Sequence, residues 1–317
     1  MTDMELPALG GTNPLGFLAA LGILDVLHRA GREPTMRWTA DLVPRPVLGS
    51  MKDADELVEL VDADRVRWQG SVVLRGPADN PLDDVKPPPG VHGKWAKEVF
   101  DTLGDTRADA DLFCALLAEG AADGKGNGKP THLHFTAGQQ KFLVMVRELA
   151  NRVDAERIRE AIFGPWREDS PLPTLSWNSQ GERLYAVRAV NPSNEKRLGV
   201  PGADWLAFLG LVFFPTRAVT GNYGQPPSLK TSGCDRSWKR SALRWPLWTV
   251  SLERDIIWSL VGDSAVVGAA AAGADRKLSS DELRVRGVRQ VMEAPIRRSE
   301  QGGYGSFGGA SVLVAGG

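Results

Sequence analysis

The sequence predicts an α+β fold in which two apolar buried helices are combined with short strands. Residues 13–31 and 201–215 are apolar on nearly every side of a helix, which is typical of helices enclosed by a core. Elsewhere, short apolar or alternating runs end at prolines and glycines, a pattern that favours short strands. No repeat of fixed period runs through the 317 residues, so a repeat architecture is not expected. These patterns predict a mixed fold and leave its strand order open.

The first apolar helix is predicted by its ends as well as by its composition. Asn13 can cap the helix, and Pro14 suits the first helical position because its missing N–H has no partner to lose there. Gly31 is suited to end the helix. The glycines and alanines between its large side chains would let another backbone approach closely. Walker and dinucleotide-binding loops need a different glycine spacing, and an export signal needs basic residues before the apolar run, so we expect neither.

The remaining elements follow from local patterns. In chain order we expect strands at 36–50 broken by Pro44 and Pro46, an acidic amphipathic helix at 52–68, a loop at 76–94, and a helix from Ala108 that leads to a Gly-rich tip at 124–128. Beyond these we expect a helix capped by Thr136, a helix between Asp154 and Gly164, two strands about a turn at 178–181, the second buried helix ending at Pro215, and a helix near 252–260 among short strands.

Charge divides the chain into two parts. Residues 1–120 contain 12 basic and 20 acidic residues, whereas residues 121–317 contain 26 basic and 19 acidic ones. Together with the Gly-rich tip, this change predicts an acidic α+β region at 1–125 and a basic α+β region at 126–317 that ends in a Gly-rich segment. The two cysteines are not in a CxxC pair, which excludes a zinc ribbon or a disulfide scaffold. We therefore expect a cytoplasmic protein that does not enter a membrane.

Two histidines are the first candidates for chemistry. His132 and His134 are two residues apart, so in a strand both imidazoles would face one side and could share a metal ion. No HExxH motif, cysteine pair or carboxylate cluster accompanies them, and no GxSxG motif is present. We therefore expect no catalytic residues, no metal and no cofactor. A cytoplasmic metal-dependent hydrolase or nuclease that uses His132 and His134 is the alternative.

Basic residues that alternate with tryptophans favour contact with nucleic acid. Cations bind phosphates, and indole rings stack on exposed bases. The densest run is SLKTSGCDRSWKRSALRWPLW, residues 228–248, and two arginines precede the Gly-rich C-terminal segment. The candidate residues are Lys230, Arg236, Trp238, Lys239, Arg240 and Arg244, then Arg297 and Arg298, and, as a weaker patch at a helix N-terminus, Gln139, Gln140 and Lys141. The alternative is a solvated loop whose tryptophans fill the core.

Three blocks of sequence resemble a known family. They read NPLGFLAALGIL, HFTAGQQKFL and NPSNEKRLGVPGADWLAFLGLVFFP, and they fall within residues 13–215. In this order they are similar to the compact CRISPR-associated proteins of type I-G (formerly I-U) effector systems, which resemble large subunits. The resemblance implies a non-catalytic subunit that works with a guide RNA, target DNA, other effector subunits and a separate nuclease-helicase. The resemblance identifies no active-site residues in this sequence. Attachment through protein contacts would account for a net charge of only −1.

Overall fold

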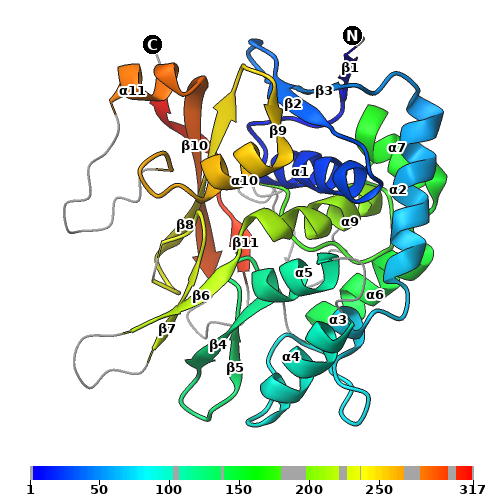
Figure 1. Ribbon diagram of the computed structural model, residues 1–317, viewed down its shortest axis with the longest axis vertical. Helices are drawn as coiled ribbons and strands as arrows, with labels where there is room; N and C mark the ends of the chain where they lie inside the picture. Colours follow the sequence, from blue (N-terminus) through cyan, green and yellow to red (C-terminus); the bar gives the residue numbers. More distant parts are fainter. Residues whose placement is uncertain are drawn as a thin grey trace, which may run out of the picture.

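The computed structural model describes residues 3–102, 107–136, 139–179, 198–220, 227–235, 237–267, 279–298 and 305–315. Antiparallel sheets lie beside a group of helices, so the predicted α+β class is confirmed (Figure 1). The described helices are α1 (Pro14–Arg29), α2 (Ala54–Trp68), α3 (Val72–Arg75), α4 (Val91–Asp101), α5 (Ala108–Leu116), α6 (Phe142–Arg152), α7 (Ala155–Phe163), α9 (Pro201–Leu209), the 3-10 helix η2 (Gly210–Phe213), α10 (Arg254–Gly262) and α11 (Ser280–Val285). In this part of the chain no helix is long and apolar enough to cross a membrane.

Two larger sheets and two hairpins contain the described strands. The first sheet has the order β1 (Met4–Glu5), β3 (Pro46–Gly49), β2 (Thr35–Trp38) and β9 (Leu252–Glu253). In the second, β10 (Val288–Arg298) pairs with β8 (Ser241–Trp248) on one side and with both β11 (Gly305–Phe307) and β12 (Ser311–Ala315) on the other. The hairpins are β4 (Leu117–Ala122) with β5 (Gly128–Pro130), and β6 (Thr216–Val219) with β7 (Ser228–Thr231). All of these pairings are antiparallel.

The two apolar helices are buried and contact each other. α1 is capped as predicted, because the Asn13 side chain accepts a hydrogen bond from the backbone N–H of Leu15 (3.1 Å). A Cβ added at Gly22 of α1 would overlap the Leu206 carbonyl of α9 and would lie 2.8 Å from its carbon atom. A Cβ added at Gly210 would overlap the Leu18 carbonyl in the same way. The predicted close approach of a second backbone is therefore confirmed, and its partner is α9.

One hydrophobic core contains residues from both predicted regions. α1 packs on α9, and β2 pairs with β9, so segments far apart in sequence lie side by side (Figure 1). The predicted boundary at residues 125/126 falls in the turn between β4 and β5. The Gly-rich tip is thus the turn of a hairpin.

Several local predictions hold and others are wrong, such as the loop predicted at 76–94, whose last residues already belong to α4. The helices α2, α7 and α10 lie where they were expected, and Asp154 caps α7 by accepting from the Arg157 N–H. Thr136 caps no helix: α6 begins only at Phe142. Residues 132–134 are not extended but form a turn, in which the His134 N–H donates to the Thr131 carbonyl (3.1 Å). The strands expected about 178–181 fall mostly outside the described residues, and residues 175–179 contain no strand.

We expect the glycine contact between α1 and α9 to tolerate no side chain. Gly22→Ala should lower the free energy of unfolding by about 3 kcal/mol, because backbone atoms on both sides prevent the Cβ from being accommodated. Gly93→Ala in α4 is the matched control, since its Cβ would meet no atom within 4 Å. That change should raise stability by up to about 1 kcal/mol through helix propensity. Urea unfolding measures the free energy of unfolding of both variants. Equal changes in this free energy for Gly22→Ala and Gly93→Ala would contradict the prediction.

A buried carboxyl group makes stability depend on pH. Burial of Asp204 in α9 raises its pKa to about 7, although the hydrogen bonds from the Leu175 N–H and the Thr174 side chain lower it. The folded protein therefore keeps this proton while the unfolded chain loses it near pH 4. The protonated Asp204 carboxyl group contributes fully to the stability of the fold below pH 4, and this contribution is lost as the pH rises to about 7. Each unit of difference between the folded and the unfolded pKa corresponds to about 1.4 kcal/mol. The melting temperature of Asp204→Asn, measured relative to that of the unchanged protein, should rise between pH 4 and pH 8. A difference between the two melting temperatures that stays constant over this range would contradict the prediction.

Candidate nucleic-acid interface

The turn that carries the two histidines is buried and connects several segments. The backbone N–H of His132 donates to Thr231 Oγ1 at the end of β7 (3.0 Å), and its Nδ1 lies 3.0 Å from the same oxygen. His134 Nε2 lies 2.6 Å from Asp84 Oδ1. Burial lowers the pKa of His134, and the hydrogen bond to Asp84 opposes this shift. Each imidazole thus has its own partner on a different segment. Within the described ranges, no three His, Cys, Asp or Glu side chains are grouped so as to hold a metal ion.

Trp238 lies between this turn and the end of β10. The guanidinium carbon of Arg298 is 3.7 Å from the centroid of the Trp238 ring, and the His132 ring lies 5.4 Å from it. Arg298 also donates to the carbonyls of His132 (2.7 Å) and His134 (3.3 Å). Burial lowers the pKa of Arg298 to about 10, so the group is still a cation at neutral pH. Trp238 and Arg298, which the sequence predicts as nucleic-acid contacts, stack on each other and form one anchor.

The anchor fixes a bend that exposes two cations. Lys239 and Arg240 follow Trp238 directly, and both are exposed. Neither has a carboxylate within 4.0 Å among the described residues. The Arg240 N–H donates to Ser237 Oγ (3.2 Å), which closes the bend on itself. Two of the predicted phosphate-binding residues are therefore presented to solvent by a firmly attached segment.

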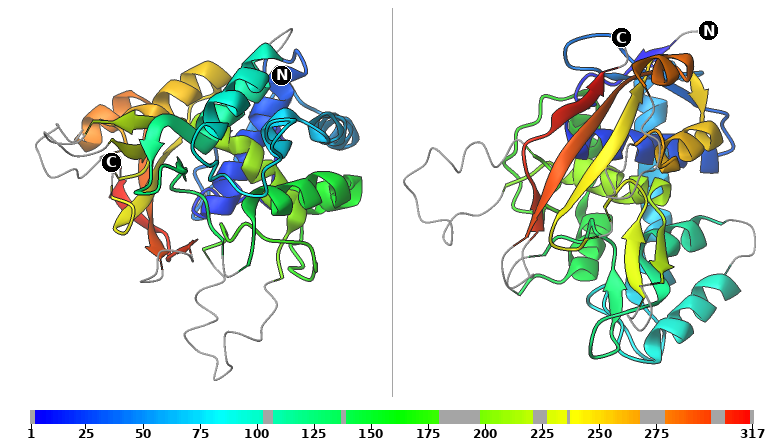
Figure 2. Two further views of the ribbon diagram at one scale, coloured as in Figure 1. Left: turned by 90° about the horizontal axis from the view of Figure 1, so that it is seen from below. Right: turned by 90° about the vertical axis from the view of Figure 1, so that its left-hand side faces the viewer.

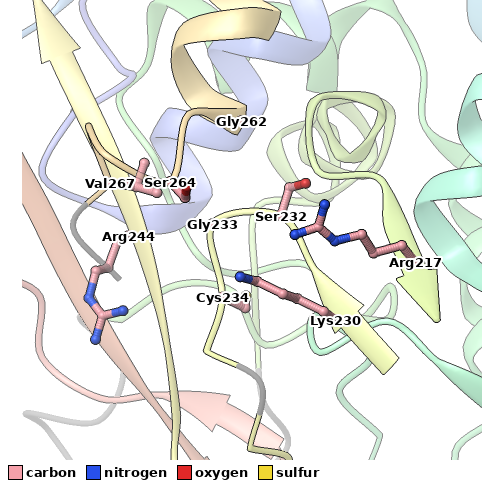
Figure 3. Close-up of a pocket in the computed structure, with 9 residues that line it drawn as sticks. All are labelled: Arg217, Lys230, Ser232, Gly233, Cys234, Arg244, Gly262, Ser264 and Val267. Carbon is pink, nitrogen blue, oxygen red and sulfur yellow. The ribbon is translucent and has the colours of Figure 1, made fainter. Parts of the chain in front are cut away.

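The β6–β7 hairpin adds a second pair of cations. Lys230 was predicted, and its partner across the two strands is Arg217, which the sequence did not single out. Residues directly opposite in an antiparallel pair project from the same face. Arg217 is exposed and Lys230 is half-buried, and no carboxylate of the described chain lies within ion-pair distance of either. Figure 3 shows Arg217 reaching toward Ser232 and Lys230 toward Cys234.

Arg244 has a different environment from its neighbours. Its side chain is buried and is bound by two carboxylates: Asp235, through Nη1 (2.6 Å) and Nη2 (3.2 Å), and Glu293, through Nε (2.7 Å). In Figure 3 it points away from Arg217 and Lys230. Its charge thus joins β8 to β10 and to the residues after β7. The neighbouring Trp245 and Trp248 are fully buried, as expected for tryptophans that fill a core.

The other predicted residues are Arg297, Arg236 and the segment 139–141. Arg297 is exposed near the end of β10, opposite Ser306 of β11, and Arg236 lies outside the described residues. Gln139, Gln140 and Lys141 are exposed before α6. The first N–H groups of that helix already have acceptors, because Phe142 donates to Asp84 Oδ1 (3.3 Å) and Leu143 donates to the Asp83 carbonyl (3.0 Å).

Ion pairing differs between the acidic and the basic part of the chain. Most arginines of the acidic part have carboxylate partners, as in the pairs Arg29–Asp25, Arg32–Glu56 and Arg67–Asp109. In the described basic part, several cations have no carboxylate within 4.0 Å; we call four of them, Arg217, Lys230, Lys239 and Arg240, the unpaired cations. The right-hand view of Figure 2 shows the β6–β7 hairpin beside the sheet of β8 and β10.

The three sequence blocks that carry the family resemblance meet inside the molecule. The first block is α1, the second leads into α6, and the third contains α9, on which both of the others pack. Residues 137–138 and 191–197 of these blocks lie outside the described part of the chain. No protein-family model and no curated protein matches this chain at a significant level.

Proposed function

We propose that this chain is a non-catalytic subunit of a cytoplasmic CRISPR RNA-guided DNA-targeting complex, in which it contacts the nucleic-acid backbone and partner subunits. The observation that carries the nucleic-acid contact is the set of four unpaired cations, two on the β6–β7 hairpin and two in the bend before β8. Phosphates would supply the negative charge that the described residues do not provide. The link to CRISPR systems comes from the three sequence blocks alone.

The division of roles in such a complex fits a subunit without a strongly basic surface. Base pairing between guide RNA and target DNA reads the sequence, while protein reads the shape of the backbone. Four cations suffice for a local contact with a few phosphates, and other effector subunits would supply the rest. A separate nuclease-helicase would perform the cleavage. The net charge of −1 is consistent with a subunit that protein contacts also hold.

The hydrolase alternative requires both imidazoles at one metal ion. His132 is bound through Nδ1 to Thr231 and His134 through Nε2 to Asp84, and among the described residues no three His, Cys, Asp or Glu side chains are grouped so as to hold a metal ion. We therefore favour the binding subunit. Replacing both histidines by Gln would abolish turnover by a hydrolase and would leave the binding of a subunit largely unchanged.

The first test of the proposed function is a tagged pull-down from the native cell. We expect short RNAs of uniform length together with partner proteins, because a guide complex contains both. Nuclease treatment followed by sizing identifies the RNA, and mass spectrometry identifies the partners. Recovery of the protein without either would overturn the proposal.

A charge-reversal experiment tests the exposed bend directly. Lys239→Glu with Arg240→Glu should weaken the binding of single-stranded RNA and should reduce the salt slope by about 1.4, since each lost phosphate contact contributes about 0.7. Lys52→Glu with Lys97→Glu changes the net charge by the same amount at exposed sites of the acidic part. This control should retain the slope. The same slope in all three proteins would show that the bend does not contact phosphate.

A further inference from the structure

A small hollow lies over the face of the β6–β7 hairpin that bears Arg217 and Lys230. It encloses about 120 Å³ and is also lined by Ser232, Ser264 and the backbone at Gly233 (Figure 3). A water molecule takes roughly 30 Å³ of the liquid, so the hollow has room for about four. This is enough for one small tetrahedral anion with its partners, and too little for a nucleobase as well.

The charges around the hollow favour an anion. Like charges directly opposite each other in an antiparallel pair are destabilising, and Arg217 faces Lys230 across the two strands. The acids nearest in sequence form no ion pair with either cation: Asp235 binds Arg244, and Asp263 accepts from the Ala265 N–H. The Cys234 thiol also lines the hollow, and because burial raises its pKa it stays neutral and does not repel an anion. An anion placed between the two cations would remove their repulsion.

We infer that this hollow binds the terminal phosphate monoester of a nucleic-acid strand. A monoester carries about two negative charges near neutral pH and so balances two cations, whereas an internal phosphodiester carries only one. Arginine can bind two phosphate oxygens through its planar fork, lysine binds as a point charge, and the hydroxyls of Ser232 and Ser264 can donate to the remaining oxygens. The inference rests on the proposed contact with nucleic acid and adds that this contact includes a strand end.

The test compares ten-nucleotide single strands of RNA and DNA that carry a phosphate at the 5′ end, at the 3′ end or at neither. Fluorescence anisotropy should show that the unchanged protein binds one of the phosphorylated forms at least about tenfold more tightly than the hydroxyl form, as expected for new charge-assisted hydrogen bonds. Arg217→Met with Lys230→Met should abolish this preference. The pair Lys239→Met with Arg240→Met is the matched control: it should weaken the binding of all strands and keep the preference.

A stability measurement separates a binding role from a structural one. Methionine retains an apolar stem and removes the charge, so Arg217→Met should leave the melting temperature in phosphate-free buffer unchanged or raise it, because the repulsion from Lys230 is gone. A clear fall in melting temperature would mean that these side chains hold the hairpin together. Such a result would overturn the inference.

Further measurements distinguish a phosphate at a strand end from a free phosphate ester. If no strand binds at all, the proposed function fails; if strands bind without any preference for a phosphorylated end, only this inference fails. Inorganic phosphate and a nucleoside monophosphate are then added alone. If strands show no end preference, stabilisation by either compound that disappears in the Arg217→Met, Lys230→Met protein would show that the hollow binds free phosphate esters in place of a strand end.

Discussion

The contact between Gly22 of α1 and the Leu206 carbonyl of α9 is the constraint on which the rest of the fold depends. Two helices can approach this closely only where neither has a side chain at the contact, and Gly22 and Gly210 satisfy this from both sides. Because α9 continues through η2 directly into β6, the position of the helix pair also fixes where the β6–β7 hairpin begins. The placement of Arg217 and Lys230 therefore follows from a backbone contact deep in the core.

The N-terminal part of α1 positions the second sheet. Phe17 lies in the first turns of the helix and contacts Trp38 of β2 and Trp245 and Trp248 of β8, with ring centroids 5.6 to 6.4 Å apart. The Trp245 indole N–H donates to the Gly11 carbonyl just before the helix (2.8 Å). These contacts hold β8 against the helix pair, and the bend with Lys239 and Arg240 leads directly into that strand. Both pairs of unpaired cations are thus attached to one rigid centre.

Sequence reasoning succeeded where the deciding interactions were local. Asn13 and Asp154 are caps that bind within three residues of themselves, so a short pattern contains the whole interaction. The start of α6 was missed because its first N–H donates to the side chain of Asp84, which is 58 residues away from Phe142. Arg217 was missed for the same reason: only the register of two strands shows that it faces Lys230. Composition can identify a basic segment, but the pairing of each charge depends on the fold.

Arg244 and Lys239 illustrate how differently the fold treats residues of one basic run. Arg244 is desolvated, which is tolerable only because Asp235 and Glu293 bind all sides of its guanidinium. Lys239, five residues earlier, remains in water and needs no such partner. The buried ion pairs and the Trp238–Arg298 stack hold the segment in place, and this rigidity lowers the entropic cost of presenting the exposed cations to a ligand. In a chain with a net charge of only −1, binding to a polyanion then depends on where the unpaired charges lie rather than on how many the chain contains.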